Sequence, residues 1–226
     1  MSETKNKLQK IKNYDWRKLS FELLVVFLGV TAGFLLNNWQ MQKKDENLEK
    51  QYLNAFLQDV KSNIIEFRKA ISADSLWIEQ VKPKLLVMKD GSLPIDSANI
   101  LIKQIIGISK INIQKGTYED IKNSGNLNLL HNFELKKQIV DYHVEISNLE
   151  FIDDYFYNFF NDFVMPFVFA HYNILKEKII DPRILQSNKF DNAITGYFAM
   201  VQQRKKAYDE LLQQSYSLQN RLIQIE

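Results

Sequence analysis

Residues Leu19–Leu36, LSFELLVVFLGVTAGFLL, form an apolar run of 18 residues in which Glu22 is the one charged side chain. As an α-helix the run is roughly 27 Å long, close to the thickness of a bilayer's hydrocarbon core. It ends at Asn37, Asn38 and Trp39, two amides and an aromatic residue of the kind found where lipid meets water. The sequence therefore predicts a transmembrane helix over residues 19–39, with these three residues as its membrane-interface anchor.

The charges on either side of the run predict its direction. Residues 1–18 carry six basic and two acidic residues, a net charge of +4, whereas residues 40–50 mix both signs. Because Lys and Arg in short flanks stay in the cytoplasm, we expect a cytoplasmic basic tail over residues 1–18 and an external domain over residues 40–226. A cleaved signal peptide is the alternative, but the apolar run is long for one and no small-residue cleavage site follows it.

Composition narrows the class of the external domain. Beyond residue 18, and leaving Glu22 aside, the chain has 23 basic and 24 acidic residues, so it has no excess of positive charge for a nucleic-acid partner. The absence of cysteine excludes disulfides, thiol nucleophiles and cysteine metal sites. Only 7 glycines and 4 prolines occur in 226 residues, which favours an ordered helical domain.

Two long stretches carry the heptad-like apolar pattern of helices that pack lengthwise. The segment from Gln40 to Val81 contains neither Gly nor Pro, and its apolar residues recur at alternating steps of four and three. Asp74 is the one charged residue at a position of this pattern. We call these positions the first seam: Leu53, Leu57, Val60, Ile64, Phe67, Ile71, Asp74, Ile78 and Val81. We therefore expect an all-α fold in which the transmembrane helix continues into a long external helix.

The second stretch lies in a final helix that we expect from about Phe190 to the end of the chain. Its second seam comprises Ile194, Tyr197, Val201, Arg204, Tyr208, Leu211, Ser215, Leu218, Leu222 and Ile225. Eight of these ten residues are apolar, so this helix should pack along another helix of an elongated bundle. The partner is either the first seam or another subunit, and the intrachain bundle is favoured.

Shorter helices are expected between the two seams. Pro83 should bend or end the first long helix, and Asp96 or Ser97 should cap a helix over about residues 97–109. Another short helix is expected over residues 117–122.

A third long helix should follow the short ones. Asn132 is expected to cap it, and Pro166 to kink it. Its segment 151–172 holds ten aromatic residues, but Asp153, Asp154 and Asp162 argue against a second span. Bundle core is the favoured interpretation of this segment, ahead of a protein interface, a ligand pocket or a contact with the membrane surface.

The predicted transmembrane helix has one polar, small-residue face. Gly29 and Gly33 form a G-x-x-x-G step, which lets two helix backbones approach closely. At 100° per residue, Glu22 lies within about 20° of both glycines. Glu22, Gly29 and Gly33 are therefore a candidate helix–helix contact in the membrane. The alternatives for Glu22 are a position near the cytoplasmic headgroups beside Arg17 and Lys18, or a proton path.

The sequence contains no constellation of residues that indicates a reaction. His131, His143 and His171 lack metal-ligand spacing, and no glycine-rich phosphate loop is present. Adjacent carboxylates such as Asp153 and Asp154 diverge by 100° on a helix rather than converge on a substrate. We therefore expect no catalytic residues, no metal, no cofactor and no enzymatic activity.

A second motif, after the transmembrane stretch, carries a family resemblance. It comprises Tyr118, Glu119, Lys122, Ser124, Gly125, Asn126 and Leu127, which we call the turn block. With Glu22, Gly29 and the Asn-Asn-Trp exit, the chain resembles an uncharacterised family of small bacterial single-span membrane proteins. The resemblance implies the inner membrane of a Gram-negative envelope and a periplasmic external domain. In physical terms the turn block is expected to stop a helix and reverse the chain, or else to form a docking loop.

These features favour a membrane-anchored scaffold or accessory subunit, either a homo-oligomer or part of a larger envelope complex. Its partners would be the lipid bilayer and other membrane proteins, with no nucleic acid. The alternative is a periplasmic helical bundle that senses a ligand and needs a membrane partner to transmit its signal.

Overall fold

The computed structural model describes residues 16–107 and 110–224. Its elements are the α-helices α2 (Trp16–Lys89), α3 (Ile95–Ile106), α4 (Gly116–Asn123), α5 (Phe133–Phe159), α6 (Met165–His171) and α7 (Asn188–Ile223), the 3-10 helices η1 (Asn126–Leu129) and η3 (Pro182–Gln186), the π-helix η2 (Phe160–Val164), and the strands β1 (Tyr172–Asn173) and β2 (Lys178–Ile179). The predicted all-α bundle is confirmed. The small antiparallel hairpin β1–β2, which pairs Tyr172 with Ile179, was not expected from the sequence.

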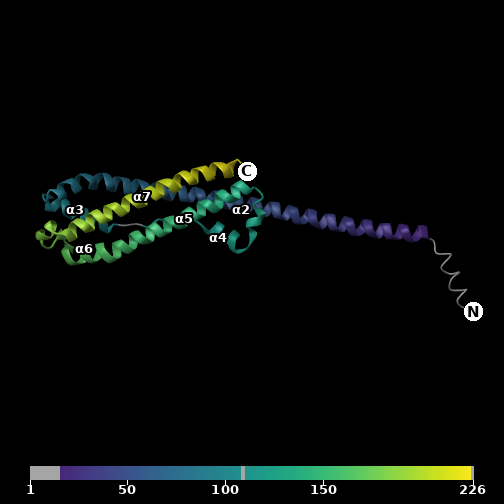
Figure 1. Ribbon diagram of the computed structural model, residues 1–226, viewed down its shortest axis with the longest axis horizontal. Helices are drawn as coiled ribbons and strands as arrows, with labels where there is room; N and C mark the ends of the chain where they lie inside the picture. The colour runs from purple at the N-terminus through teal and green to yellow at the C-terminus, as the bar shows by residue number, and fades with distance from the viewer. Residues whose placement is uncertain (1–15, 108–109, 225–226) are drawn as a thin grey trace, which may run out of the picture. The chain divides into compact units, whose positions relative to one another are not determined.

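The chain divides into two compact units, residues 1–49 and residues 50–226. In the second unit the part of α2 after Lys50 packs with α5 and α7, which lie side by side (Figure 1). Both predicted seams face this interior. Every described position of the second seam is buried, while residue 225 lies outside the described part of the chain. The first seam is buried or half-buried throughout, so the bundle forms within one chain.

The core of the second unit consists of two apolar clusters. One surrounds Phe56, Phe67 and Tyr208, and the other surrounds Val81, Leu101 and Phe190. All six side chains are nearly inaccessible to solvent. Burial of apolar area on this scale is the main stabilising contribution to such a bundle.

Of the two effects expected of Pro83, a bend or an end of the helix, the structure excludes the end, because α2 continues to Lys89. Val81 and Met88, on either side of the proline, are both buried in the cluster around Val81, and this packing stabilises the last turns of the helix. The predicted capping of the next helix by Asp96 or Ser97 is wrong. Pro94 occupies the N-cap of α3 without a side-chain hydrogen bond, since its fixed φ already suits a helix start.

Other helix boundaries follow the expected chemistry. The Asn132 side chain accepts a hydrogen bond from the Leu135 N–H at 3.0 Å and caps α5, as predicted. The last helix begins at Asn188, two residues earlier than expected, because Ser187 caps it by accepting from the Phe190 N–H. The irregularity expected near Pro166 takes the form of the π-helix η2, directly before α6.

Candidate functional site

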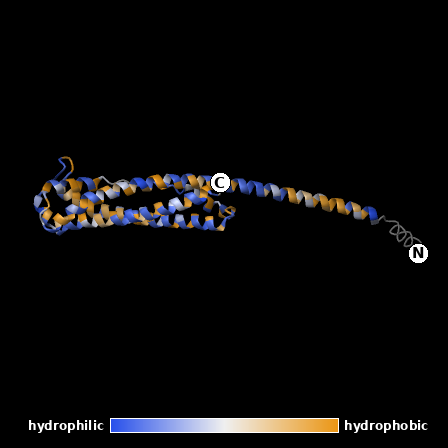
Figure 2. Ribbon diagram, turned by 90° about the horizontal axis from the view of Figure 1, so that it is seen from above, coloured by the Kyte–Doolittle hydropathy of each residue, from blue (hydrophilic) through white to orange (hydrophobic). Residues whose placement is uncertain are grey.

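The apolar part of α2 in the first unit is uncovered. It is the one helix among the described residues that is long and apolar enough to cross a membrane, and none of its most apolar 18-residue window is buried. Phe21 is 68% exposed and Phe27 is 65% exposed. Figure 2 shows this segment as mainly hydrophobic and the residues that follow it as hydrophilic. Side chains that are apolar over most of a helix's circumference favour an apolar environment outside that helix.

The face predicted from Glu22, Gly29 and Gly33 is open. A Cβ built at either glycine has no neighbouring atom within 4 Å, so the surface beside them is flat and accessible to another backbone. The hydroxyl of Thr31, a polar residue within the apolar run, donates to the Phe27 carbonyl at 2.8 Å. This bond satisfies the hydroxyl within its own helix.

The residues predicted as the interface anchor continue the same helix. Trp39 is 58% exposed, and Asn37 is also exposed, with its Nδ2 lying 3.6 Å from the Met41 Sδ. Asn38 is half-buried. All three side chains remain in α2, so no break in the helix marks the predicted exit from the membrane.

The turn block lies in the second unit, where it connects α4 to α5. Gly125 adopts φ +73°, a left-handed conformation that glycine allows at no steric cost and that reverses the chain. Ser124 is the C-cap of α4, and its hydroxyl donates to the Ile121 carbonyl at 3.2 Å. Asn126 Nδ2 donates to the Tyr52 hydroxyl at 3.3 Å, and this bond links the turn to α2.

The remaining members of the turn block divide between core and surface. The ring of Tyr118 stacks on His143 of α5, with centroids 4.1 Å apart and planes 7° apart. Leu127 is half-buried against the cluster around Phe56. Glu119 and Lys122 are exposed, and Glu119 lies 3.5 Å from Lys115. The block therefore combines packed aromatic and aliphatic side chains with two exposed charges.

A buried charge network is the main feature that the sequence reasoning did not identify. Arg204 of α7 donates to Asp74 of α2 in a two-pronged ion pair, with Nη2–Oδ1 at 2.5 Å and Nε–Oδ2 at 3.1 Å. The guanidinium lies 4.2 Å from the centre of the Phe156 ring. The Tyr208 hydroxyl donates to Asp153 of α5 at 2.9 Å. The network therefore joins α2, α5 and α7 in the centre of the bundle.

Burial raises the pKa of both carboxyls in this network, although the hydrogen bond from Arg204 to Asp74 and that from Tyr208 to Asp153 oppose the shift. A signal for the ion pair was present in the sequence. Asp74 and Arg204 are the charged residues of the first and second seams, and opposite charges inside two apolar seams indicate that they pair.

A second polar network holds the segment before α4 on the bundle. Asn63 of α2 is completely buried, and its amide exchanges hydrogen bonds with Gln114 of the loop: Gln114 N–H donates to Oδ1 at 2.7 Å, and Nδ2 donates to the Gln114 carbonyl at 2.9 Å. Asn63 Nδ2 also lies 3.2 Å from the Tyr142 hydroxyl, which bonds to Ser215 at 3.1 Å. Both networks pair polar groups of one helix with those of other elements and hold these elements together.

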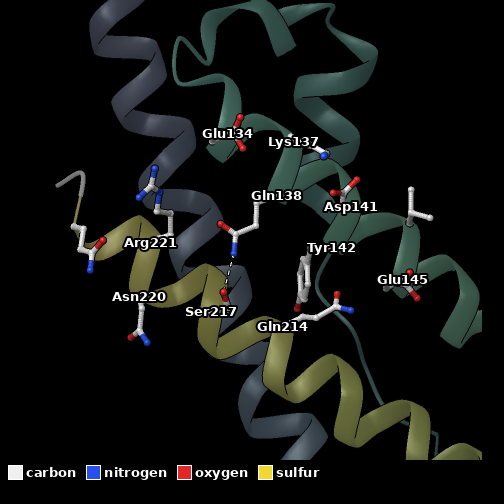
Figure 3. Close-up of a pocket in the computed structure, with 12 residues that line it drawn as sticks. Glu134, Lys137, Gln138, Asp141, Tyr142, Glu145, Gln214, Ser217, Asn220 and Arg221 are labelled. Carbon is white, nitrogen blue, oxygen red and sulfur yellow. Dashed lines mark hydrogen bonds between the residues drawn. The ribbon is translucent and has the colours of Figure 1, made fainter.

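A groove lined mainly by polar residues lies between the first half of α5 and the end of α7 (Figure 3). Its volume is about 920 Å³, and Gln138 crosses it to donate to the Ser217 hydroxyl at 3.0 Å. Glu134, Asp141 and Arg221 contribute charges of both signs. No group of three or more metal-ligating side chains occurs among the described residues.

An aromatic cleft of about 460 Å³ lies beside the π-helix. Phe159, Phe163 and Phe167 line it from one side, and Lys189 of α7 lies at its edge. Phe159 packs directly over Gly196, where an added Cβ would lie 2.6 Å from the ring. The part of segment 151–172 that faces α7 is therefore core, as favoured from the sequence, whereas Phe151 is 73% exposed and Phe163 is 66% exposed.

Comparisons with models of protein families, with curated proteins and with solved structures found no match, so the function is inferred from the residues and contacts of this chain itself.

Proposed function

We propose that this protein is a non-enzymatic, membrane-anchored scaffold or accessory subunit of a bacterial envelope complex. Residues 19–39 hold it in the inner membrane, with the N-terminus in the cytoplasm and the helical bundle in the periplasm. It associates with its partners through the membrane helix and the external bundle. The partner of the membrane helix is either a second copy of the chain or a subunit of a larger complex.

The uncovered apolar segment of α2 carries this proposal. Leu24, Phe27 and Leu28 are all more than half exposed, and no described part of the chain buries their window. Transfer of one such side chain from water to an apolar environment contributes about 1.5–3 kcal/mol, so the whole segment strongly favours lipid over water. The basic tail that precedes it supports the cytoplasmic location of the N-terminus.

The association through this helix is supported by its open glycine face. Glu22, Gly29 and Gly33 share one side of the helix, and small residues allow the close backbone packing that associates helices in lipid. A carboxylate on the same side favours a protein or water neighbour over a lipid one. Phe27 lies elsewhere on the helix and provides a control position.

The test is purification of the full chain in mild detergent, with sizing and identification of the proteins that co-purify. Gly29→Leu and Gly33→Leu should disrupt the assembly because they force the backbones apart, while Phe27→Leu should leave it intact. The same assembly for all three variants would contradict the glycine contact. Glu22→Gln separates packing from proton transfer, since an amide can pack but cannot ionise.

The orientation is tested by fusing a reporter that is active only outside the cytoplasm. Fusion after Glu226 should give activity, and fusion after Lys18 should give none. Activity in fusions before residue 145 that disappears in fusions after residue 180 would contradict the single-span topology, because the aromatic segment would then cross the membrane.

A periplasmic ligand-sensing bundle that signals through a membrane partner is the second candidate function. The aromatic cleft beside the π-helix favours it, since its volume of about 460 Å³ falls in the range of small-molecule sites and π-helical turns often occur at functional positions. A small apolar ligand should then raise the melting temperature of the wild type but not that of Phe163→Asp, which places a charge in the cleft.

A further inference from the structure

The turn of the β1–β2 hairpin presents aliphatic side chains to solvent. Leu175 is 93% exposed, the highest value for any large apolar side chain among the described residues, and Ile174 in the same turn is 46% exposed. These two residues form what we call the hairpin tip. Because these side chains are exposed, they do not stabilise the folded chain by burial. Any role for them therefore requires contact with another molecule.

The hairpin is nevertheless held firmly at its base. Tyr172 and Ile179 are buried in the cluster that includes Met88, and the Ile179 N–H donates to the Asn99 side chain of α3 at 2.8 Å. The Ile180 N–H donates to the His171 carbonyl at 2.9 Å. A fixed base orders the tip in advance and lowers the entropy lost when the tip binds a partner.

The charge around the tip is positive. The two carboxylates of this region are paired, Glu177 with Lys103 at 2.6 Å and Asp181 with Arg183 at 2.7 Å. Lys176 and Lys178 are exposed, and no ion pair among the described residues involves them. An aliphatic tip flanked by two such lysines is complementary to the surface of an anionic bilayer, which offers negative headgroups beside an apolar interior.

The size of the tip favours lipid over a protein partner. A stable protein interface buries about 800 Å² on each partner, far more than two aliphatic side chains provide. Insertion into a bilayer has no such minimum area, because each apolar side chain that enters the lipid adds its own favourable transfer free energy.

The hairpin packs on α3 near the end of α2. We infer that the hairpin tip docks on the anionic surface of a lipid bilayer. This contact does not rest on the proposed membrane anchor.

The test uses the full chain in nanodiscs of phosphatidylcholine, mixed with protein-free vesicles that are floated on a density gradient. Discs with wild-type protein should float with vesicles rich in phosphatidylglycerol and not with pure phosphatidylcholine vesicles. Lys176→Glu with Lys178→Glu should lower the affinity by at least about fivefold for each lysine. Leu175→Asp should abolish most of the binding, and Leu76→Asp, the same exchange at an exposed site on α2, should leave it unchanged.

Equal flotation of the wild type and Leu175→Asp, with both folded by circular dichroism, would overturn the lipid contact. Equal binding to neutral vesicles would overturn the role of the lysines. Association of discs with one another without vesicles, lost in Leu175→Asp, would assign the tip to a second copy of the chain instead. Failure of the chain to enter nanodiscs would contradict the proposed anchor, and hairpin-dependent binding of the free protein to vesicles would then still support the lipid contact.

Discussion

Two parts of the helix α2 share a regular helical backbone but differ in the width of their apolar surface and in its exposure to solvent. In α2, residues 19–36 are apolar over most of the circumference and exposed, whereas residues 53–81 carry an apolar stripe that is buried by α5 and α7. Phe27 is 65% exposed and Phe67 is completely buried. The comparison teaches that the angular width of the apolar surface, not its helical propensity, decides which partner a helix needs. Neighbouring helices cover a stripe, whereas a wider apolar surface needs a partner on most sides, which in this chain we propose is lipid.

The strongest way to break the packed part is to place a charge in the second seam. Leu218 is 1% exposed, and Leu218→Asp removes its packing and buries a carboxylate without a partner. We expect the free energy of unfolding to fall by more than about 4 kcal/mol, measured by urea denaturation of the detergent-solubilised chain. Asp209→Ala, outside the seam, should change it by less than about 1 kcal/mol. A smaller effect of Leu218→Asp would contradict the intrachain seam.

A matched exchange sharpens the comparison within α2 itself. Phe67→Ala should lower the free energy of unfolding by roughly 3–5 kcal/mol, because it leaves a cavity in the cluster around Phe56 and Tyr208. Phe27→Ala makes the same chemical change at an exposed position and should leave unfolding of the bundle unaltered. If the two variants lose equal stability, then residues 19–36 take part in the folded core.

The buried ion pair provides a test of polar contacts in the packed part. Arg204→Met should destabilise the protein by roughly 3–5 kcal/mol, because Asp74 then stays buried without its cation. The double variant Asp74→Leu with Arg204→Met should come within about 1 kcal/mol of the wild type, since apolar side chains replace both partners. A double variant as unstable as the single one would mean that the pair itself, rather than an unpaired charge, determines stability.

The smallest expected effect concerns pH. Burial, followed by the charge of Lys115, lowers the pKa of His143 from 6.5 to about 4. The unfolded chain therefore binds more protons between these values, so this stabilising contribution is complete above pH 6.5 and is lost as the pH falls toward 4. The total change is up to about 3 kcal/mol.

His143→Phe isolates this contribution. The raised pKa values of Asp74 and Asp153 act in the opposite sense above pH 3.8, but they are present in both proteins and cancel in the difference. The free energies of unfolding of wild type and His143→Phe should therefore diverge in one direction from pH 6.5 to pH 4. If the free energies of unfolding of wild type and His143→Phe differ by the same amount at every pH, the lowered pKa of His143 would be contradicted.

The sequence by itself determined the helical class, the two seams and the apolar segment. These features depend on the spacing of apolar residues along a helix, which is a local property of the chain. Leu57, Val60 and Leu211 are buried as their heptad positions require. The cap at Asn132 also follows from local chemistry, since a side chain bonds to an N–H three residues away.

The tertiary structure alone decided which helices pair and which polar residues meet. Asp74 and Arg204 are 130 residues apart; their charges within two apolar seams made a pair plausible, but only the packing of α2 against α7 brings them into contact. Because residues on both sides of Pro83 are packed in the core, α2 continues through a residue that usually ends a helix. The hairpin that exposes Leu175 has only two residue pairs, too few for a periodic signal, and it exists because Tyr172 and Ile179 are buried against the bundle. Such features depend on free energy from contacts distant in the sequence, which spacing along the chain does not reveal.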